Sequence, residues 1–142
     1  MLGGGNPVSS SNPAGIGTSI NYIGNHAYAT SGNFPDTQAQ VTMLKFDTGN
    51  AYILGKFAFF GSTHTDQGAG SITAGNTNNF QVLMDGQTVA VVKTDTQQED
   101  MPSEMVIPML LPPNTRFEIK VISAGAASDY STQVSFVGRV YQ

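Results

Sequence analysis

The sequence predicts an all-β domain, an eight-stranded antiparallel β-sandwich of the jelly-roll type, preceded by an extended N-terminal arm. After residue 20, apolar residues recur with a period of two rather than 3.6. The apolar runs are short and separated by Gly, Asn, Asp and Pro, and no segment has the pattern of a helix. Eight such runs within about 120 residues, joined by polar loops, are typical of a jelly roll.

Each expected strand is an alternating apolar run bounded by turn-forming residues. The eight segments are residues 25–31, 40–47, 51–61, 78–85, 87–94, 104–111, 115–123 and 132–142. Asp85 and Gly86 supply the positive φ angles that a two-residue type I′ turn requires. Pro112 and Pro113 cannot donate to a β-ladder, so we expect a second reversal there. Pro108, inside the sixth run, favours an edge strand or a bulge.

The alternation also predicts which side chains are buried. Phe117, Ile119 and Val121 share one face of segment 115–123 and should lie in the core, with charged residues on the other face. Segments 52–60 and 132–142 carry apolar residues on both faces. We therefore expect segment 132–142 to be central in its sheet or covered by a neighbour, and segment 52–60 to be buried on both faces or to lie at a subunit contact.

Composition excludes several classes of function. Charged residues make up 11% of the chain, the net charge is −4, and the basic residues are not clustered, which disfavours binding to a nucleic-acid backbone. The chain contains no cysteine and no apolar run approaching the roughly 20 residues of a membrane span. Its N-terminus lacks the basic start and hydrophobic stretch of a signal peptide, so we expect no export by that route.

No catalytic site is predicted. The chain has only His26 and His64 as imidazole bases, no cysteine nucleophile and no G-x-S-x-G motif. His64 and Asp66 could lie on one face of an extended segment, but the sequence offers no third metal ligand at a recognisable spacing. We therefore interpret both as residues of an exposed loop at 61–77, and His26 as an ordinary strand residue.

Two binding alternatives remain open. Asp95, Glu99, Asp100 and Glu104 could bind a calcium ion through a loop, although their spacing is not that of an EF-hand and solvated charges are the simpler interpretation. No other cofactor is expected. A glycan site would use exposed aromatic residues beside the amides of residues 76–81, although aromatic residues of a tryptophan-free β domain usually form its core. The aromatic candidates are Tyr22, Tyr28, Phe34, Tyr52 and Tyr130.

The arm, residues 1–20, has a composition that cannot form a core of its own. It is rich in Gly, Ser, Pro and Asn, and its larger aliphatic residues are Leu2, Val8, Ile16 and Ile20. Ordering such a segment costs backbone entropy that its few apolar side chains cannot offset alone. We therefore expect these four residues to anchor the arm on a neighbouring subunit, and residues 21–142 to form the β-sandwich.

Two stretches resemble small jelly-roll virion proteins of bacteriophages. They are "NPAGIGTSINYIGNHAYATSG" at 12–32 and "MVIPMLLPPNTRFEIKV" at 105–121, where a strand, a Pro-Pro turn and a strand of alternating charge follow one another. The resemblance implies a non-enzymatic head decoration (cement) or auxiliary capsid protein. It further implies a homo-oligomer, commonly a trimer, held noncovalently on the major capsid protein at the virion surface and assembled in the host cytoplasm.

Two other classes of function are kept as alternatives to this resemblance. A glycan-binding jelly roll, acting as a receptor-binding or adhesive module, would not need the arm. A subunit of an extracellular filament would donate the arm to a neighbour and polymerise instead of forming a closed assembly.

Overall fold

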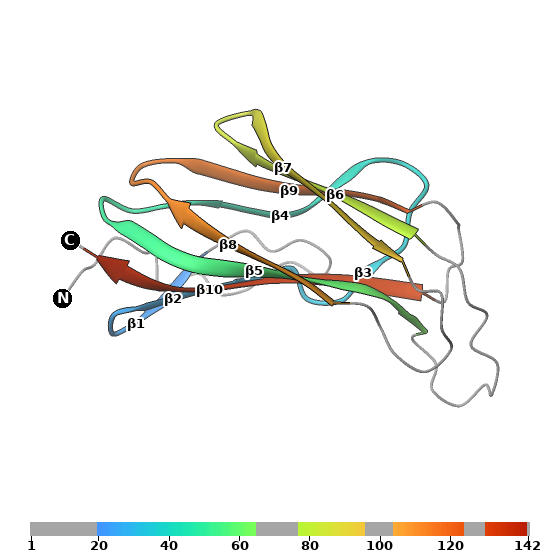
Figure 1. Cartoon of the computed structure of the whole chain (residues 1–142), viewed down its shortest axis with the longest axis horizontal. Coiled ribbons are helices and arrows are strands. Elements are labelled where there is room, and N and C mark those ends of the chain that lie inside the picture. Colours follow the sequence, from blue (N-terminus) through green and yellow to red (C-terminus); the bar gives the residue numbers. More distant parts are fainter. Residues whose placement is uncertain (1–19, 65–76, 96–103, 124–129, 142) are drawn as a thin grey trace.

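The β-strands of the computed structural model form two antiparallel sheets that pack face to face (Figure 1). Residues 20–64, 77–95, 104–123 and 130–141 are described. The strands are β1 (Asn21–Ile23), β2 (His26–Thr30), β3 (Phe34–Pro35), β4 (Val41–Asp47), β5 (Tyr52–His64), β6 (Thr77–Met84), β7 (Gln87–Asp95), β8 (Glu104–Leu111), β9 (Arg116–Ser123) and β10 (Tyr130–Tyr141).

The strand order is that of a jelly roll. One sheet has the order β1-β2-β10-β5-β8, with β3 also paired to β10, and the other has the order β4-β9-β6-β7. Strands adjacent in sequence therefore cross repeatedly between the sheets, which mixes the N-terminal and C-terminal halves of the chain in both layers. The C-terminal strand β10 is central, between β2 and β5, as its two apolar faces predicted.

All eight predicted strands are confirmed, with two additions and one correction. The additions are β1 and β3, which flank β2 in sequence and are only three and two residues long. The correction concerns the loop expected at 61–77. Strand β5 continues to His64, which pairs with Tyr130 of β10, so His64 is a strand residue and not a loop residue. Residues 65–76 lie outside the described part of the chain.

The turns confirm the predictions made from Gly, Asp and Pro. Asp85 and Gly86 have φ angles of 47° and 82°, so the β6–β7 turn has both positive values of a type I′ hairpin. Pro108 lies on β8, an edge strand. At the β8–β9 turn, Thr48 from the β4–β5 connection accepts a hydrogen bond from Thr115 N–H (2.9 Å) and donates one to the Pro112 carbonyl (2.6 Å).

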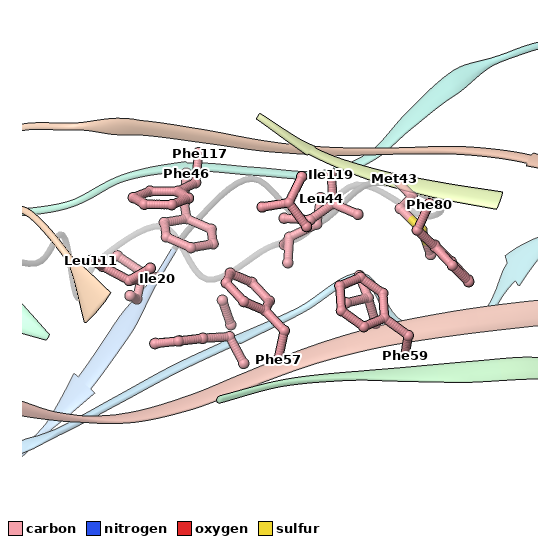
Figure 2. Packing of buried hydrophobic residues seen from close by; sticks show 14 of the residues in the cluster. Ile20, Met43, Leu44, Phe46, Phe57, Phe59, Phe80, Leu111, Phe117 and Ile119 are labelled. Atoms are coloured by element: carbon pink, nitrogen blue, oxygen red, sulfur yellow. The ribbon is translucent and has the colours of Figure 1, made fainter. Parts of the chain in front are cut away.

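The core between the sheets is dominated by phenylalanine. Figure 2 shows Phe57 of β5 near Phe46 and Phe117 of the opposite sheet, and Phe59 of β5 near Phe80 of that sheet. The Phe57 ring lies 4.7 Å from Phe136 and about equally far, 6.5 Å, from both Phe46 and Phe117, measured between ring centroids. Since aromatic rings bury large apolar areas, this cluster supplies the stabilisation that a tryptophan-free and cysteine-free domain needs.

Two glycines make room for this cluster. Gly55 of β5 is paired directly with Gly138 of β10. A Cβ atom on Gly55 would lie 2.4 Å from the Val137 carbonyl oxygen and 2.6 Å from Cζ of Phe136. Both glycines occupy inward positions on their strands, so the space a side chain would fill is taken by the Phe136 ring and the neighbouring backbone.

Candidate assembly surface

The two outer faces of the sandwich differ in chemistry. The outer face of the four-stranded sheet, β4-β9-β6-β7, is mainly polar. Lys45 and Glu118 form an ion pair across β4 and β9 (3.3 Å), and Gln40 donates a hydrogen bond to Gln81 (3.0 Å). Confirming the predicted alternation, Phe117, Ile119 and Val121 of β9 are buried while charged residues lie between them on the outer side. This face is suited to contact with water.

At one end of the polar face lies an open hollow lined by charged groups. Its lining residues are Asp47, Asp85, Gly86, Asn114, Arg116 and Glu118. Arg116 binds Asp47 through Nε (2.9 Å) and Nη2 (3.3 Å), and its backbone N–H donates to Asp85 Oδ1 (2.9 Å). The hydrogen bond to Asp47 is the main reason that the pKa of Arg116 is raised. The Asp47 carboxylate is thus already paired with a cation, and Asp85 Oδ1 already accepts a hydrogen bond from the backbone.

The outer face of the six-stranded sheet is apolar. It carries eight of the eleven exposed large apolar side chains found among the described residues. These eight residues define the apolar face: Ile23, Tyr28, Tyr52, Leu54, Val106, Leu110, Val137 and Tyr141. Leu54 and Leu110 are 52% and 51% exposed, although both lie in the interior of a strand. Contiguous exposed apolar surface of this kind marks an interaction site.

Strand register places these side chains side by side. In antiparallel pairing, residues opposite each other point to the same face. Leu54 of β5 is paired with Arg139 of β10 and with Leu110 of β8. The next row on this face contains Val137, paired with Tyr28 of β2. The apolar side chains therefore lie in neighbouring rows that extend from β1 to β8, with Arg139 and Lys56 placed among them.

The charges on the apolar face are few and mostly positive. Lys56 lies in the row of Val137, and the Arg139 guanidinium lies 5.7 Å from the centroid of the Tyr141 ring. The His26 and Tyr28 rings are stacked with their centroids 6.4 Å apart. Glu104 lies at the far end, paired with the half-buried Phe60. A protein with a net charge of −4 thus presents two cations here.

Of the four predicted arm anchors, one, Ile20, lies in the described part of the chain. Ile20 is only 4% exposed and belongs to the core cluster of its own domain, together with Leu111 and Ala27. Figure 2 shows it beside Leu111, between the sheets. Leu2, Val8 and Ile16 lie outside the described residues. Ile20 therefore stabilises the sandwich itself, and the proposal of an intersubunit arm depends on the other three residues.

Some of the residues considered for catalysis or metal binding lie in the described part of the chain. His26 is an exposed residue of β2, as expected of an ordinary strand residue. No three His, Asp or Glu residues among those described are grouped so that they could hold a metal ion, and no described helix is long and apolar enough to cross a membrane. Of the calcium candidates, Glu99 and Asp100 fall outside the described ranges, as does Asp66.

The glycan candidates are not grouped into one site. Phe34 is buried, and Tyr22 is partly buried against the core, where its hydroxyl accepts a hydrogen bond from Gly49 N–H (3.3 Å). Tyr28 and Tyr52 are exposed on the apolar face, 38% and 52% respectively. Tyr130 lies in β10. The two exposed tyrosines thus belong to the apolar face and have Val137 and Leu54 nearby.

Sequence reasoning identified the strands that form the apolar face but not the face itself. The apolar character of segments 52–60 and 132–142 on both sides is the available signal, and for segment 52–60 it predicts burial on both faces or a subunit contact. Joining β2, β5, β8 and β10 into one surface required the strand order, because these strands are far apart in sequence.

The fold and this surface define the class: an eight-strand jelly-roll sandwich, extended by two short strands, with one apolar outer face. No known protein-family model matches the chain, and no curated protein matches it. Among solved structures, it is similar to the infectious bursal disease virus T13 viral particle (TM-score 0.45, 13% identity, 98% of this chain and 36% of that chain).

Two further structures from the same virus are similar to it. They are the VP2 subviral particle (TM-score 0.45, 11% identity, 96% of this chain and 38% of that chain) and the T=1 particles derived from the virus (TM-score 0.43, 13% identity, 98% and 37%). The chain spans little more than a third of the length of these proteins. At such low identities the similarity concerns the fold alone.

Proposed function

We propose that this chain is a non-enzymatic structural protein of a virion, which assembles with copies of itself through noncovalent contacts. The observation that supports the proposal most directly is the apolar face, an outer sheet surface whose composition resembles a protein interface more than a solvated surface. The resemblance of residues 12–32 and 105–121 to bacteriophage virion proteins supports a virion as the assembly that contains the chain.

The finer proposal is a decoration or cement protein, bound to the major capsid protein at the virion surface and assembled in the host cytoplasm. A closed homo-oligomer, for which a trimer is the expected form, would carry the repeated contacts. The low content of charged residues, 11%, also suits this role. When copies pack together, few charged groups would lose their contact with water without gaining a partner.

The virion role is tested on purified particles from the culture that carries this gene. Peptides of the chain should be found by mass spectrometry in particles banded on a density gradient, at a constant ratio to the major shell protein. A surface position predicts that protease removes them while the shell stays closed and the genome stays protected. Absence of the chain from banded particles would contradict the virion role.

The arm gives the second test of this proposal. A chain beginning at Thr18 keeps the core residue Ile20 but lacks Leu2, Val8 and Ile16. We expect it to fold with the same circular dichroism spectrum and to show a lower native mass, or weaker association, than the full chain by light scattering. The Ile16→Asp variant of the full chain should have the same effect on association.

Equal native mass of the full and shortened chains at all concentrations would mean that the arm is not an assembly element. Loss of folding on removal of residues 1–17 would contradict the boundary drawn between the arm and the sandwich.

A further inference from the structure

We infer that the apolar face binds the same face of a second copy of this chain, sheet against sheet, about a two-fold axis. The inference rests on the proposed function, because it names the surface through which copies of the chain assemble. It adds a specific contact, and a symmetry, that the arm and the expected trimer do not supply.

The size of the face fits this occupant. The five hydrogen-bonded strands β1, β2, β10, β5 and β8 contain 3, 5, 12, 13 and 8 residues, and each residue covers about 4.8 by 3.4 Å of the outer face of the sheet. In total, that is roughly 700 Å² for each copy, close to the ~800 Å² per partner of a stable protein interface. Tyr28, Tyr52 and Tyr141 add the aromatic anchors that are enriched in such interfaces.

Other occupants fit less well. Besides Met1, the arm of a neighbour carries only Leu2, Val8 and Ile16 as large apolar residues before Ile20, too few to cover eight exposed apolar side chains. A sugar would place hydroxyl groups against Leu54 and Val137, which offer no hydrogen-bond partner, and burying them unpaired is costly. A second copy presents the same apolar surface over the same area.

The charges of the face give the contact a recognisable signature. A two-fold contact repeats the two cations, Lys56 and Arg139, on both sides, with Glu104 only at the far end. Like charges therefore approach one another. Because salt screens this repulsion, raising the ionic strength should strengthen the association. A different partner bearing carboxylates would instead be released by salt.

The two-fold symmetry predicts that the assembly contains an even number of copies of the chain. A contact that uses the same patch on both copies is closed by two subunits. If the arm also joins copies into rings of three, the two contacts together give six copies, as two stacked trimers. A trimer held together by the arm alone would leave the apolar face uncovered.

The test compares two matched substitutions in the full-length protein. Leu54→Lys places a third cation on the apolar face, and Val91→Lys places the same charge on β7 of the polar sheet, at a residue that is 66% exposed. Both positions are exposed, so both variants should fold with unchanged circular dichroism and thermal melting. Sedimentation equilibrium at low and high salt then gives each self-association constant.

We expect Leu54→Lys to weaken pairing by at least about tenfold, as for a residue near the centre of an interface, and Val91→Lys to leave it unchanged. Lys56→Gln should tighten pairing, and salt should tighten it in the unmodified protein. A protein that forms oligomers of the same mass with Leu54→Lys would overturn the inference while leaving the proposed function standing. An unmodified protein that is monomeric at all concentrations and salts, yet is present in purified particles, would also overturn it.

Discussion

Replacing Phe57 with alanine should lower the free energy of unfolding by about 3–5 kcal/mol, the cost of removing a buried aromatic ring that its surroundings cannot replace. The Phe57 side chain is fully buried and is in ring contact with Phe136, Phe59 and two phenylalanines of the opposite sheet. These neighbouring rings are attached to two different sheets. They therefore cannot all move into the cavity that the missing Phe57 ring would leave. Urea denaturation followed by circular dichroism measures the loss.

The control for this prediction lies on the same strand. Phe60 is half-buried on the outer side of β5, so Phe60→Ala removes the same atoms without opening a core cavity. Its effect on stability should be clearly smaller. Equal losses for Phe57→Ala and Phe60→Ala would show that the inward and outward sides of β5 are not assigned correctly.

Adding one methyl group at Gly55 should also destabilise the domain strongly, by about 3 kcal/mol, because the core is already filled there. The new Cβ would lie 2.4 Å from the Val137 carbonyl oxygen and 2.6 Å from the Gly138 Cα atom, both of which are backbone atoms. Strands β5 and β10 would have to move apart, which stretches the central ladder of the sheet.

Gly138→Ala provides the comparison for this second prediction. Its Cβ would meet side-chain atoms, Cγ2 of Ile53 at 2.6 Å and Cζ of Phe136 at 2.8 Å, which can shift more readily than backbone. We expect its effect on the urea midpoint to be smaller than that of Gly55→Ala. If Gly138→Ala lowered the urea midpoint more than Gly55→Ala, the backbone ladder between β5 and β10 would accept an added methyl group more easily than the side-chain cluster packed against it.

Much of the fold follows from the sequence because local alternation and turn chemistry agree. Asp85 and Gly86 specify a type I′ turn by their φ preferences alone, and the alternation around Phe117 assigns both faces of β9. The missed strand β1 had a usable signal: Gly24 and Asn25 form a two-residue connection between the paired residues Ile23 and His26. Strand β3 is two residues long and had none.

The rest could not be predicted because it depends on strands meeting from distant parts of the chain. Residues 61–64 read as a loop from their Gly, Ser, Thr and His composition, but pairing with β10 extends β5 to His64. From its position in the sequence, Ile20 is predicted to belong to the arm. Only the packing of the two sheets shows that it is buried beside Leu111. The apolar face likewise required the strand order.

The most direct test of the account uses the absence of native cysteines to place single thiols on the two outer faces. Leu54→Cys lies on the apolar face and Val91→Cys on the polar sheet, and each would be the only cysteine in its chain. Their rates of reaction with a thiol-specific reagent are measured at a dilution where the protein is monomeric and at a concentration where it is assembled. The account predicts that assembly protects the Leu54→Cys thiol and leaves the Val91→Cys thiol reactive. Equal reactivity of the Leu54→Cys thiol before and after assembly would contradict it.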